Sequence, residues 1–358
     1  MSKLFIKGNE AIAEAAVRGG CRFFAGYPIT PQNEIPEYMS RRLPEVGGVF
    51  VQGESELASI NMIYGAAYAG VSSLTSSSGP GLSLMAEGIS SLAASGFPAV
   101  LVNMMRGGPG TGAIQGAQMD YMQATRGGGH GGYRMPVLAP GSVQEAVDLV
   151  YEAFDIAWKY MTPVLVVADG YIGSVMEAVE LPPMKESKRK EFPLYTTVHL
   201  NPENPHRRSS CTMITNEVDH EEWNKVQAAK YEKMAEELVR CEEFMMEDAE
   251  YVMVAYGTSA RVARNAVISL REQGIKAGLI RPILIWPYPY EALRKLDSAK
   301  VKNIFCLELS IPAQMVEDVR FGVYDRIPVT TYGRSAGLTF SEEDVEELVK
   351  KTIEGGEK

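Results

Sequence analysis

The stretch SLTSSSGPGLSLMAEGISSLAA, residues 73–94, contains the pattern that decides the fold. Ser73–Ser76 has the character of a buried strand, Ser77–Gly81 has the composition of a tight turn, and Leu82–Ala94 places apolar residues at helical spacing. A strand, a turn and a helix in this order predict one unit of a parallel sheet covered by helices. Ligands of this fold class bind at the loops that follow the carboxyl ends of such strands.

The same alternation fills the first half of the chain, which we interpret as a domain of residues 1–180. In its clearest helix, Val143–Tyr160, Ser142 and Glu145 form a predicted capping box. We therefore expect an α/β fold built on a doubly wound parallel sheet. The other predicted strands are Arg22–Ala25, Gly48–Gln52, Ala99–Met104 and Val164–Ala168, and the other predicted helices are Glu10–Arg18, Gln32–Arg42 and Glu56–Ala69.

The composition changes after this domain, and residues 181–248 are predicted to connect it to a second one. Residues 182–208 are rich in Pro, Lys, Glu and Arg, which predicts an extended connection, and Asp219–Met246 is predicted to be one long charged helix. Residues 249–358 then resume the alternation as a smaller α/β domain. Its predicted elements are strands at Tyr251–Tyr256, Lys276–Ile280 and Val301–Leu307, a helix that ends before Gly274, and a helix from Glu342 that Ser341 and Asp344 cap.

Composition excludes several classes of protein. Of the 358 residues 46% are apolar, which allows a large buried core. No apolar run approaches the roughly 18 residues of a membrane helix, and Met1–Lys7 lacks the apolar centre of a secretory signal. The net charge of −10 disfavours nucleic-acid binding. The four cysteines, Cys21, Cys211, Cys241 and Cys306, form no C-x-x-C pair, which predicts reduced thiols in the cytoplasm and no zinc or iron–sulfur site within this chain.

Two loops that follow predicted strands contain candidate binding residues. In Tyr27-Pro28-Ile29-Thr30-Pro31, Thr30 can cap the next helix, whose N-terminus would suit an anionic or polar group, although a plain structural cap is the alternative. In Gln52–Glu56, a glutamate could move protons in a site or could only stabilise the helix dipole. Ser78 and Gly79 lie in a turn tight enough for backbone to approach a ligand, although loop geometry alone explains that turn equally well.

A long glycine-rich segment, Arg106–Tyr133, is the densest signal in the chain. Such loops in compact domains are usually functional or mobile, and this one has neither Walker nor Rossmann spacing. Arg106 leaves a strand at the predicted ligand edge, where its guanidinium could grip a carboxylate through two hydrogen bonds; a surface salt bridge is the alternative. His130 could donate a proton, or it could be an ordinary solvated histidine.

Taken together and in this order, the motifs resemble the alpha subunit of 2-oxoacid:ferredoxin oxidoreductases over nearly the whole chain. The resemblance implies an N-terminal domain that binds the aminopyrimidine of thiamine diphosphate and a second domain similar to the C-terminal domain of transketolase. The motifs that support it are Tyr27–Pro31, Gln52–Glu56, Ser78–Gly81, Arg106–Pro109 and Arg281–Pro287.

The resemblance also implies roles for individual residues. A glutamate activates the cofactor by bonding its pyrimidine: counting back from Gly65-Ala66 places this residue at Glu56, whereas counting from Gln52 places it at Glu54. Arg106 would hold the substrate carboxylate, and Thr30 would polarise the oxo group or orient the acid. The remaining residues that would contact the cofactor are Tyr27, Pro28, Ile29, Ser78 and Gly79.

Partners and substrate follow from the same resemblance. A beta subunit would supply the diphosphate and Mg²⁺ site and a [4Fe–4S] cluster, with gamma and delta subunits in a dimer of heteromers, coenzyme A as co-substrate and ferredoxin as electron acceptor. Gln123–Gly131 looks most like subunits for branched-chain acids such as 3-methyl-2-oxobutanoate, and Ala113–Gln118 lacks the T-E-Q run typical of members that act on 2-oxoglutarate. Pyruvate or 2-oxoglutarate as substrate, a non-catalytic scaffold, and a self-sufficient enzyme using Ala168-Asp169-Gly170 and Asn201 are the alternatives.

Overall fold

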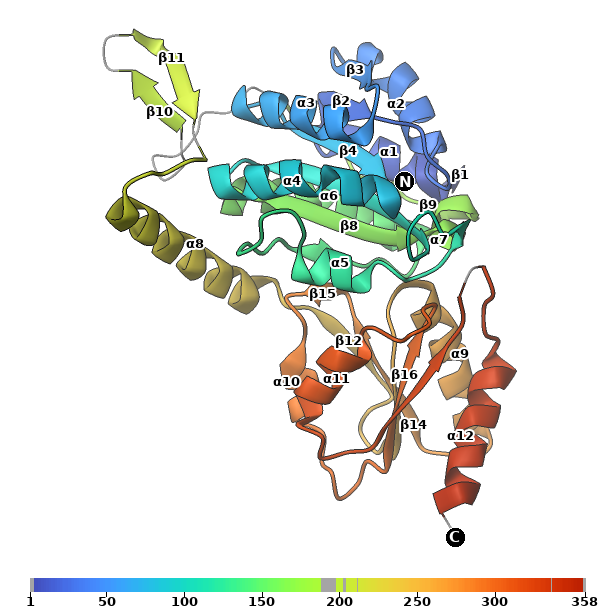
Figure 1. Cartoon of the computed structure of the whole chain (residues 1–358). Helices are drawn as coiled ribbons and strands as arrows, with labels where there is room; N and C mark the ends of the chain where they lie inside the picture. The colour runs from blue at the N-terminus through green and yellow to red at the C-terminus, as the bar shows by residue number, and fades with distance from the viewer. Residues whose placement is uncertain (1–2, 188–197, 202–203, 211, 336, 357–358) are drawn as a thin grey trace.

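The computed structural model describes residues 3–187, 198–201, 204–210, 212–335 and 337–356. They form two lobes, each built on a largely parallel sheet, and helix α8 (Glu217–Leu238) runs along one side between them (Figure 1). Part of the predicted extended connection, 182–208, lies outside the described residues, and Cys211 also lies outside them. Two described strands of this region, β10 (Val198–Asn201) and β11 (Asn204–Ser210), pair as an antiparallel hairpin.

The sheet of the first lobe confirms all five strands predicted for it. Its parallel strands run in the spatial order β7, β8, β5, β4, β2, β3, and the short β6 turns back antiparallel on the end of β5. The two-residue strand β7 was not predicted, because so short a segment has no period that sequence can reveal. The strands are β2 (Phe23–Gly26), β3 (Val49–Gln52), β4 (Ser73–Ser77), β5 (Ala99–Gly107), β6 (Ala113–Gly116), β7 (Val137–Leu138) and β8 (Pro163–Asp169).

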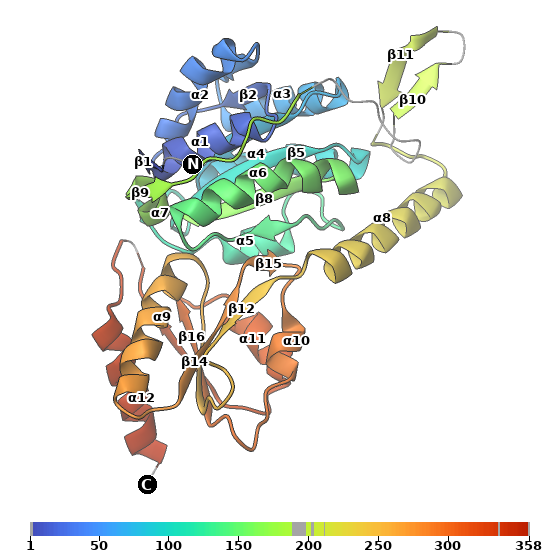
Figure 2. The same ribbon diagram turned by 180° about the vertical axis from the view of Figure 1, so that it is seen from behind.

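Helices cover both faces of this sheet, as the doubly wound prediction requires. On β5, Val102 and Met104 pack with α1 and α6, whereas Leu101 and Met105 pack with α3 and α4. Figure 2 shows α1 and α6 in front of the sheet. The helices are α1 (Gly8–Arg18), α2 (Glu34–Glu45), α3 (Glu56–Tyr68), α4 (Pro80–Ser95), α5 (Tyr121–Arg126), α6 (Val143–Tyr160) and α7 (Gly170–Ser174), and β1 (Leu4–Lys7) pairs with β9 (Met176–Val179) beside them.

Two of the three predicted helix caps are confirmed. The Ser142 hydroxyl accepts from the Glu145 amide at 3.1 Å, and Ser341 and Asp344 exchange both bonds of a capping box at 3.2 and 2.8 Å. The prediction that Thr30 caps the second helix was wrong, because α2 begins only at Glu34. The chain first makes a turn that buries the Gln32 amide, which accepts from the Ser76 hydroxyl at 2.5 Å.

The second lobe contains a five-stranded sheet in the order β12, β14, β13, β16, β17. All pairs are parallel except β12, which adds to the edge antiparallel. The prediction of one helix over Asp219–Met246 was wrong, because α8 ends at Leu238 and residues 241–244 pair with β14 instead. The elements are β12 (Cys241–Phe244), β13 (Tyr251–Val254), β14 (Ala277–Pro282), β16 (Asn303–Glu308), β17 (Val329–Gly333), α9 (Gly257–Glu272), α10 (Tyr290–Arg294), α11 (Val316–Val323) and α12 (Glu342–Gly356).

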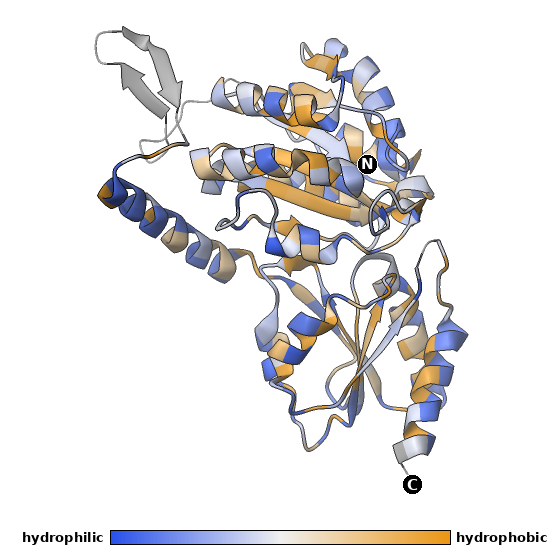
Figure 3. Cartoon of the chain, in the orientation of Figure 1, coloured by the Kyte–Doolittle hydropathy of each residue, from blue (hydrophilic) through white to orange (hydrophobic). Residues whose placement is uncertain are grey.

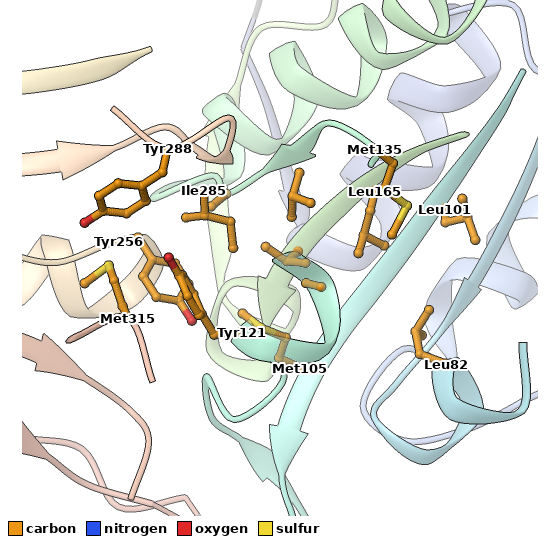
Figure 4. Close-up of a cluster of buried hydrophobic side chains, with 14 of the residues drawn as sticks. Leu82, Leu101, Met105, Tyr121, Met135, Leu165, Tyr256, Ile285, Tyr288 and Met315 are labelled. Carbon is orange, nitrogen blue, oxygen red and sulfur yellow. The ribbon is translucent and has the colours of Figure 1, made fainter. Parts of the chain in front are cut away.

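The two lobes share a strand and a core. Strand β15 (Leu284–Trp286) follows β14 in sequence but pairs antiparallel with β7 of the first sheet. One apolar cluster continues from Leu82 and Met105 of the first lobe to Tyr256 and Met315 of the second (Figure 4). The central strands are strongly apolar, whereas α8 is mostly hydrophilic (Figure 3). Within the described residues, no helix is both long and apolar enough to cross a membrane.

Candidate active site

Four loops of the first lobe gather at the carboxyl ends of neighbouring strands. They follow β2, β3, β4 and β5, which are adjacent in the sheet. The first two loops are tied together because the Gly53 amide donates to the Gly26 carbonyl at 2.9 Å. This edge therefore brings the motifs around Thr30, Glu56, Gly79 and Arg106 together, although they are far apart in sequence.

Glu56 is a buried carboxylate that has no partner among the described residues. It opens α3, which Ser55 caps by accepting from the Ala58 amide at 3.1 Å, and it is only 5% exposed. Its Oε1 would lie 2.6 Å from a Cβ added to Gly81, and the Ser77 hydroxyl would lie 1.9 Å from it. The Ser77 hydroxyl is also buried without a hydrogen bond. Unpaired buried polar groups are costly, so this arrangement fits a site that a polar ligand completes.

Glu54, the alternative glutamate, has a different environment. It lies in the loop before the helix and is exposed to solvent. A carboxylate in water is already well solvated and gains little from a ligand, whereas the Glu56 side chain is largely buried and has no hydrogen-bond partner among the described residues. The geometry therefore favours Glu56 as the carboxylate that meets a cofactor.

Arg106 lies at the end of β5 and is 5% exposed. Its Nη1 and Nη2 each donate at 2.9 Å, to the carbonyls of Thr30 and Thr111 respectively, and its buried Nε has no partner. Among the described residues it forms no ion pair, so the alternative of a surface salt bridge was wrong. Arg106 and Thr30 thus lie in direct contact, with one guanidinium donor still unsatisfied.

The turn after β4 lies directly over this arginine. Gly79 has a positive φ of 34°, and a Cβ there would lie 3.6 Å from Cγ of Arg106. The Ser78 hydroxyl donates to the Met104 carbonyl at 2.7 Å, so a ligand could meet the backbone of this turn rather than that hydroxyl. In the other predicted loop, Tyr27 and Pro28 are exposed and Ile29 is partly buried.

Two residues of this site, Asp120 and Asn103, were not found by the sequence analysis. The Asn103 amide donates to Oδ2 of Asp120 at 3.0 Å, and its own oxygen accepts from the Gly79 amide at 3.3 Å. Burial raises the pKa of Asp120 to about 6, against the opposing effects of Asn103 and Arg106. One signal was available: Asp120 is the only acidic residue between Arg106 and Tyr133.

Comparisons with known proteins identify the family. Residues 14–240 match the family described as pyruvate flavodoxin/ferredoxin oxidoreductase, thiamine diphosphate-binding, and residues 249–345 match pyruvate:ferredoxin oxidoreductase core domain II. This chain belongs to the 2-oxoacid:ferredoxin oxidoreductases. It is therefore a subunit of an enzyme that needs partner subunits, and the resemblance inferred from the motifs is confirmed.

Relatives in this oxidoreductase family are named for different substrates. The chain is 44% identical to ketoisovalerate oxidoreductase subunit VorB of Methanothermobacter thermautotrophicus, over 98% of both chains. It is 39% identical to 2-oxoglutarate synthase subunit KorA of Methanocaldococcus jannaschii, over 83% of this chain and 86% of KorA.

Solved structures confirm the predicted fold class. A 2-oxoglutarate:ferredoxin oxidoreductase from Magnetococcus marinus, solved with 2-oxoglutarate, coenzyme A and succinyl-CoA bound, superposes with a TM-score of 0.88 at 28% identity. The match covers 98% of this chain and 65% of that one, so the present chain spans about two-thirds of its length. A split-gene transketolase, with a TM-score of 0.60 at 16% identity and 97% of each chain covered, shows the transketolase-like fold alone.

Two other candidates raised by the sequence in this oxidoreductase subunit are His130 and Asp169. His130 is exposed, and its carbonyl accepts from the Ser90 hydroxyl at 2.6 Å. Asp169, the acid of the possible diphosphate motif, is fully buried and accepts from the Thr258 hydroxyl at 2.8 Å and from three backbone amides. It is thus committed to capping α7 and joining the lobes, while the Asn201 side chain lies outside the described residues.

Metal ligands do not gather within the part of the chain that the structure describes. No group of three His, Cys, Asp or Glu residues lies close enough there to hold an ion. Cys21, Cys241 and Cys306 are free thiols, and burial raises the pKa of Cys21 to about 12. Thiols of such high pKa are poor ligands at neutral pH because metals bind the thiolate.

Proposed function

We propose that this chain is the alpha subunit of an oxidoreductase that converts a branched-chain 2-oxoacid, first of all 3-methyl-2-oxobutanoate, and coenzyme A to acyl-CoA and CO₂ with electrons passed to ferredoxin. The observation that carries the proposal is that a buried Glu56 without a partner among the described residues and a buried Arg106 with one unsatisfied donor both lie at the same edge of the sheet. The substrate choice is supported by identities of 44–46% to two ketoisovalerate oxidoreductase subunits, against 34–39% to four 2-oxoglutarate synthase subunits.

Thiamine diphosphate is the cofactor that fits these residues. When bound, it supplies a carbon nucleophile for the 2-oxo group of the substrate. The Glu56 carboxylate packs against Gly81 and has no hydrogen-bond partner among the described residues, so it is free to bond and exchange a proton with a ring nitrogen of the cofactor. The backbone of Ser78 and Gly79 and the loop from Tyr27 to Ile29 would contact the same cofactor, as proposed from the motifs.

Arg106 and Thr30 are the proposed substrate residues. In the described structure, Nη1 and Nη2 of Arg106 donate to backbone carbonyls and Nε has no partner. A substrate carboxylate could accept from Nε, and from an Nη group in place of a carbonyl, through charge-assisted bonds worth about 1.5–3 kcal/mol each. The Thr30 carbonyl accepts from this guanidinium, which supports the proposal that Thr30 lies next to the bound acid. There it can orient the acid or donate to its oxo oxygen.

A partner subunit is needed to cover this site. Helices α3 and α4 carry Glu56 and the Gly79 turn, lie side by side, and are apolar on most of their circumference. Leu57, Met62 and Leu84 of these helices remain exposed, at 49%, 36% and 55%. A helix apolar on all sides is normally buried, so we propose that a beta subunit covers this surface.

That beta subunit is proposed to contribute the groups that this chain lacks. The full use of Asp169 in structural bonds supports placing the diphosphate and Mg²⁺ on the partner, and the scattered thiols support placing the [4Fe–4S] cluster there as well. Gamma and delta subunits, a dimer of heteromers, and a cytoplasmic complex complete the proposal. The division into residues 1–180, 181–248 and 249–358 is retained as a proposal, with β15 returning to the first sheet.

The function is tested on the complex co-purified without oxygen from its native host, by coenzyme A-dependent viologen reduction across a panel of 2-oxoacids. We expect 3-methyl-2-oxobutanoate to give the highest kcat/KM. A higher value with 2-oxoglutarate or pyruvate would keep the reaction and change the substrate. No turnover with any acid, from a complex loaded with thiamine and clusters, would favour a non-catalytic scaffold.

A further inference from the structure

Asp120 is a second carboxylate beside the proposed substrate arginine. It is 8% exposed, and Oδ2 is held by the Asn103 amide at 3.0 Å. A Cβ built on Gly79 would lie 3.9 Å from Oδ1 of Asp120 and 3.8 Å from the unpartnered Nε of Arg106. The carboxylate and the guanidinium therefore both lie within van der Waals reach of the same face of Gly79.

Few charges besides that of Arg106 act on Asp120. Among the described residues, the titratable groups that interact with it electrostatically are Arg106 on β5 and Tyr256 at the start of α9. Burial raises the pKa of Tyr256 well above 10, so Tyr256 stays neutral between pH 6 and 8. Within the described part of the chain, Arg106 is thus the cation that stabilises ionised Asp120.

We propose that binding of the 2-oxoacid at Arg106 is coupled to uptake of one proton by Asp120. The proposal rests on the proposed function, in which Arg106 holds the substrate carboxylate. A substrate carboxylate bound to Arg106 would lie close to the Asp120 carboxylate, and two buried negative charges near each other are less costly when one of them is neutralised. The proton comes from solvent and binds Oδ1, because Oδ2 remains the acceptor of the Asn103 amide. When the substrate carboxylate leaves as CO₂, the proton returns to solvent.

The coupling fixes the sign of a pH effect. Free Asp120 has a pKa of about 6, and a bound anion raises it further, so the complex holds more protons than the free enzyme above pH 6. Substrate affinity is then fully present below pH 6 and falls as the pH rises through the pKa of the bound state. A rise of about one pKa unit gives a KM that increases about fivefold between pH 6 and 8.

Kinetics of the assembled holoenzyme test the proposal. In Asp120→Asn, whose amide oxygen can still accept from Asn103, we expect a KM that is constant between pH 6 and 8 and no higher than that of the wild type at pH 8. Glu308→Gln is the control, because burial raises the pKa of Glu308 to about 7 but this residue lies at the end of β16 in the other lobe. It should keep the fivefold rise.

Calorimetry of the wild-type complex gives a readout that needs no variant. A non-reacting 2-hydroxy acid, 2-hydroxy-3-methylbutanoate, is titrated at pH 7 in phosphate and in Tris, whose ionisation enthalpies differ. Net proton uptake on binding supports the coupling, and identical heats in the two buffers overturn it. If Arg106→Gln leaves KM unchanged, the proposed function fails; if it raises KM while Asp120→Asn keeps the wild-type pH dependence, only the coupling fails.

Discussion

At the scale of single residues, the site depends on what the chain leaves unpaired. Glu56, the Ser77 hydroxyl and Nε of Arg106 are all buried without partners in the described structure. Burying such groups costs about 1–3 kcal/mol each. A protein that retains several of them in adjacent loops forgoes stability there, which is reasonable only if a ligand supplies the missing bonds.

The role of Glu56 can be separated from that of its neighbour Glu54. We expect Glu56→Gln to lower kcat of the assembled enzyme by about 100-fold or more, because general acid–base groups typically contribute 10²–10⁴ in rate. The melting temperature should not fall, since the carboxylate has no bond to lose. Glu54→Gln, at an exposed position two residues earlier, should stay within about threefold of the wild type. A normal rate for Glu56→Gln together with a slow Glu54→Gln would reverse the assignment.

Gly81 provides a steric test of the packing around Glu56. A methyl group there would meet the Ser77 hydroxyl at 1.9 Å and Glu56 at 2.6 Å, so we expect Gly81→Ala to destabilise the chain by about 1–3 kcal/mol and to reduce thiamine diphosphate binding. Gly65→Ala is the matched control, since no atom lies within 4 Å of its added Cβ. It should stabilise the isolated chain by about 0.5–1 kcal/mol, as an unhindered helical glycine does. Chemical denaturation and a cofactor titration give both values, and equal effects of the two substitutions would contradict the packing argument.

Sequence motifs could bring Thr30, Glu56, Gly79 and Arg106 forward as candidates because each follows a predicted strand and local pattern shows where strands end. They could not supply Asp120. Its significance comes from contacts with Asn103 and Gly79, 17 and 41 residues away along the chain, and no local pattern encodes them. The choice between Glu54 and Glu56 also needed structure, because only burial distinguishes two glutamates in one motif.

At the scale of elements, the sequence located long periodic segments well, but it located the end of α8 and the short strands poorly. All five predicted strands of the first sheet and the helix Val143–Tyr160 are present, since a continuous buried run or an apolar stripe marks each. The end of α8 was misplaced because Cys241–Phe244 continues the polar composition of the helix while pairing with β14. Pairing with a distant strand overrides local propensity, which is also why the short β7 and β15 were missed.

The exposed surface of α3 and α4 predicts where the partner subunit docks. We expect Leu84→Glu to leave the fold of this chain intact, because that side chain is 55% exposed, but to prevent co-purification of the beta subunit by placing a charge in an apolar interface. Ile268→Glu on α9 is the control, since Ile268 is a similarly exposed apolar helical residue of the other lobe. Affinity capture with circular dichroism of each variant measures both points. Normal assembly of Leu84→Glu would exclude this surface as the interface.

At the scale of the whole molecule, the lobes are joined by polar residues that are almost fully satisfied. Gln118 of the first lobe is fully buried: its amide donates to the Tyr256 carbonyl at 2.8 Å and accepts from Ser259 and Leu309 at 2.6 and 2.9 Å. This network lies two residues from Asp120 in sequence, so the second lobe holds the segment that contains Asp120. The second lobe thus positions part of the site proposed in the first lobe.

Arg281, in the most specific motif of the second lobe, makes an ionic link between the lobes. It bonds Glu145 of α6 twice, at 2.8 and 2.9 Å, and Glu242 of β12 at 2.9 Å, with its side chain only 13% exposed. We expect Arg281→Met to lower the free energy of unfolding by about 2–4 kcal/mol, because both carboxylates lose a poorly solvated partner. The link lies away from Glu56 and Arg106, so the remaining folded enzyme should keep its KM.

Arg240→Met is the matched comparison, since Arg240 also bonds one carboxylate twice, that of Glu152 at 2.9 and 3.2 Å, but both side chains are more than a third exposed. Surface pairs contribute about 0–1 kcal/mol, so its loss should be small. Urea denaturation of both variants measures the two losses in the free energy of unfolding. Equal losses would show that burial adds nothing to the Arg281 link, and the stability of the lobe interface would then come from the Gln118 network and the apolar core that runs from Met105 to Met315.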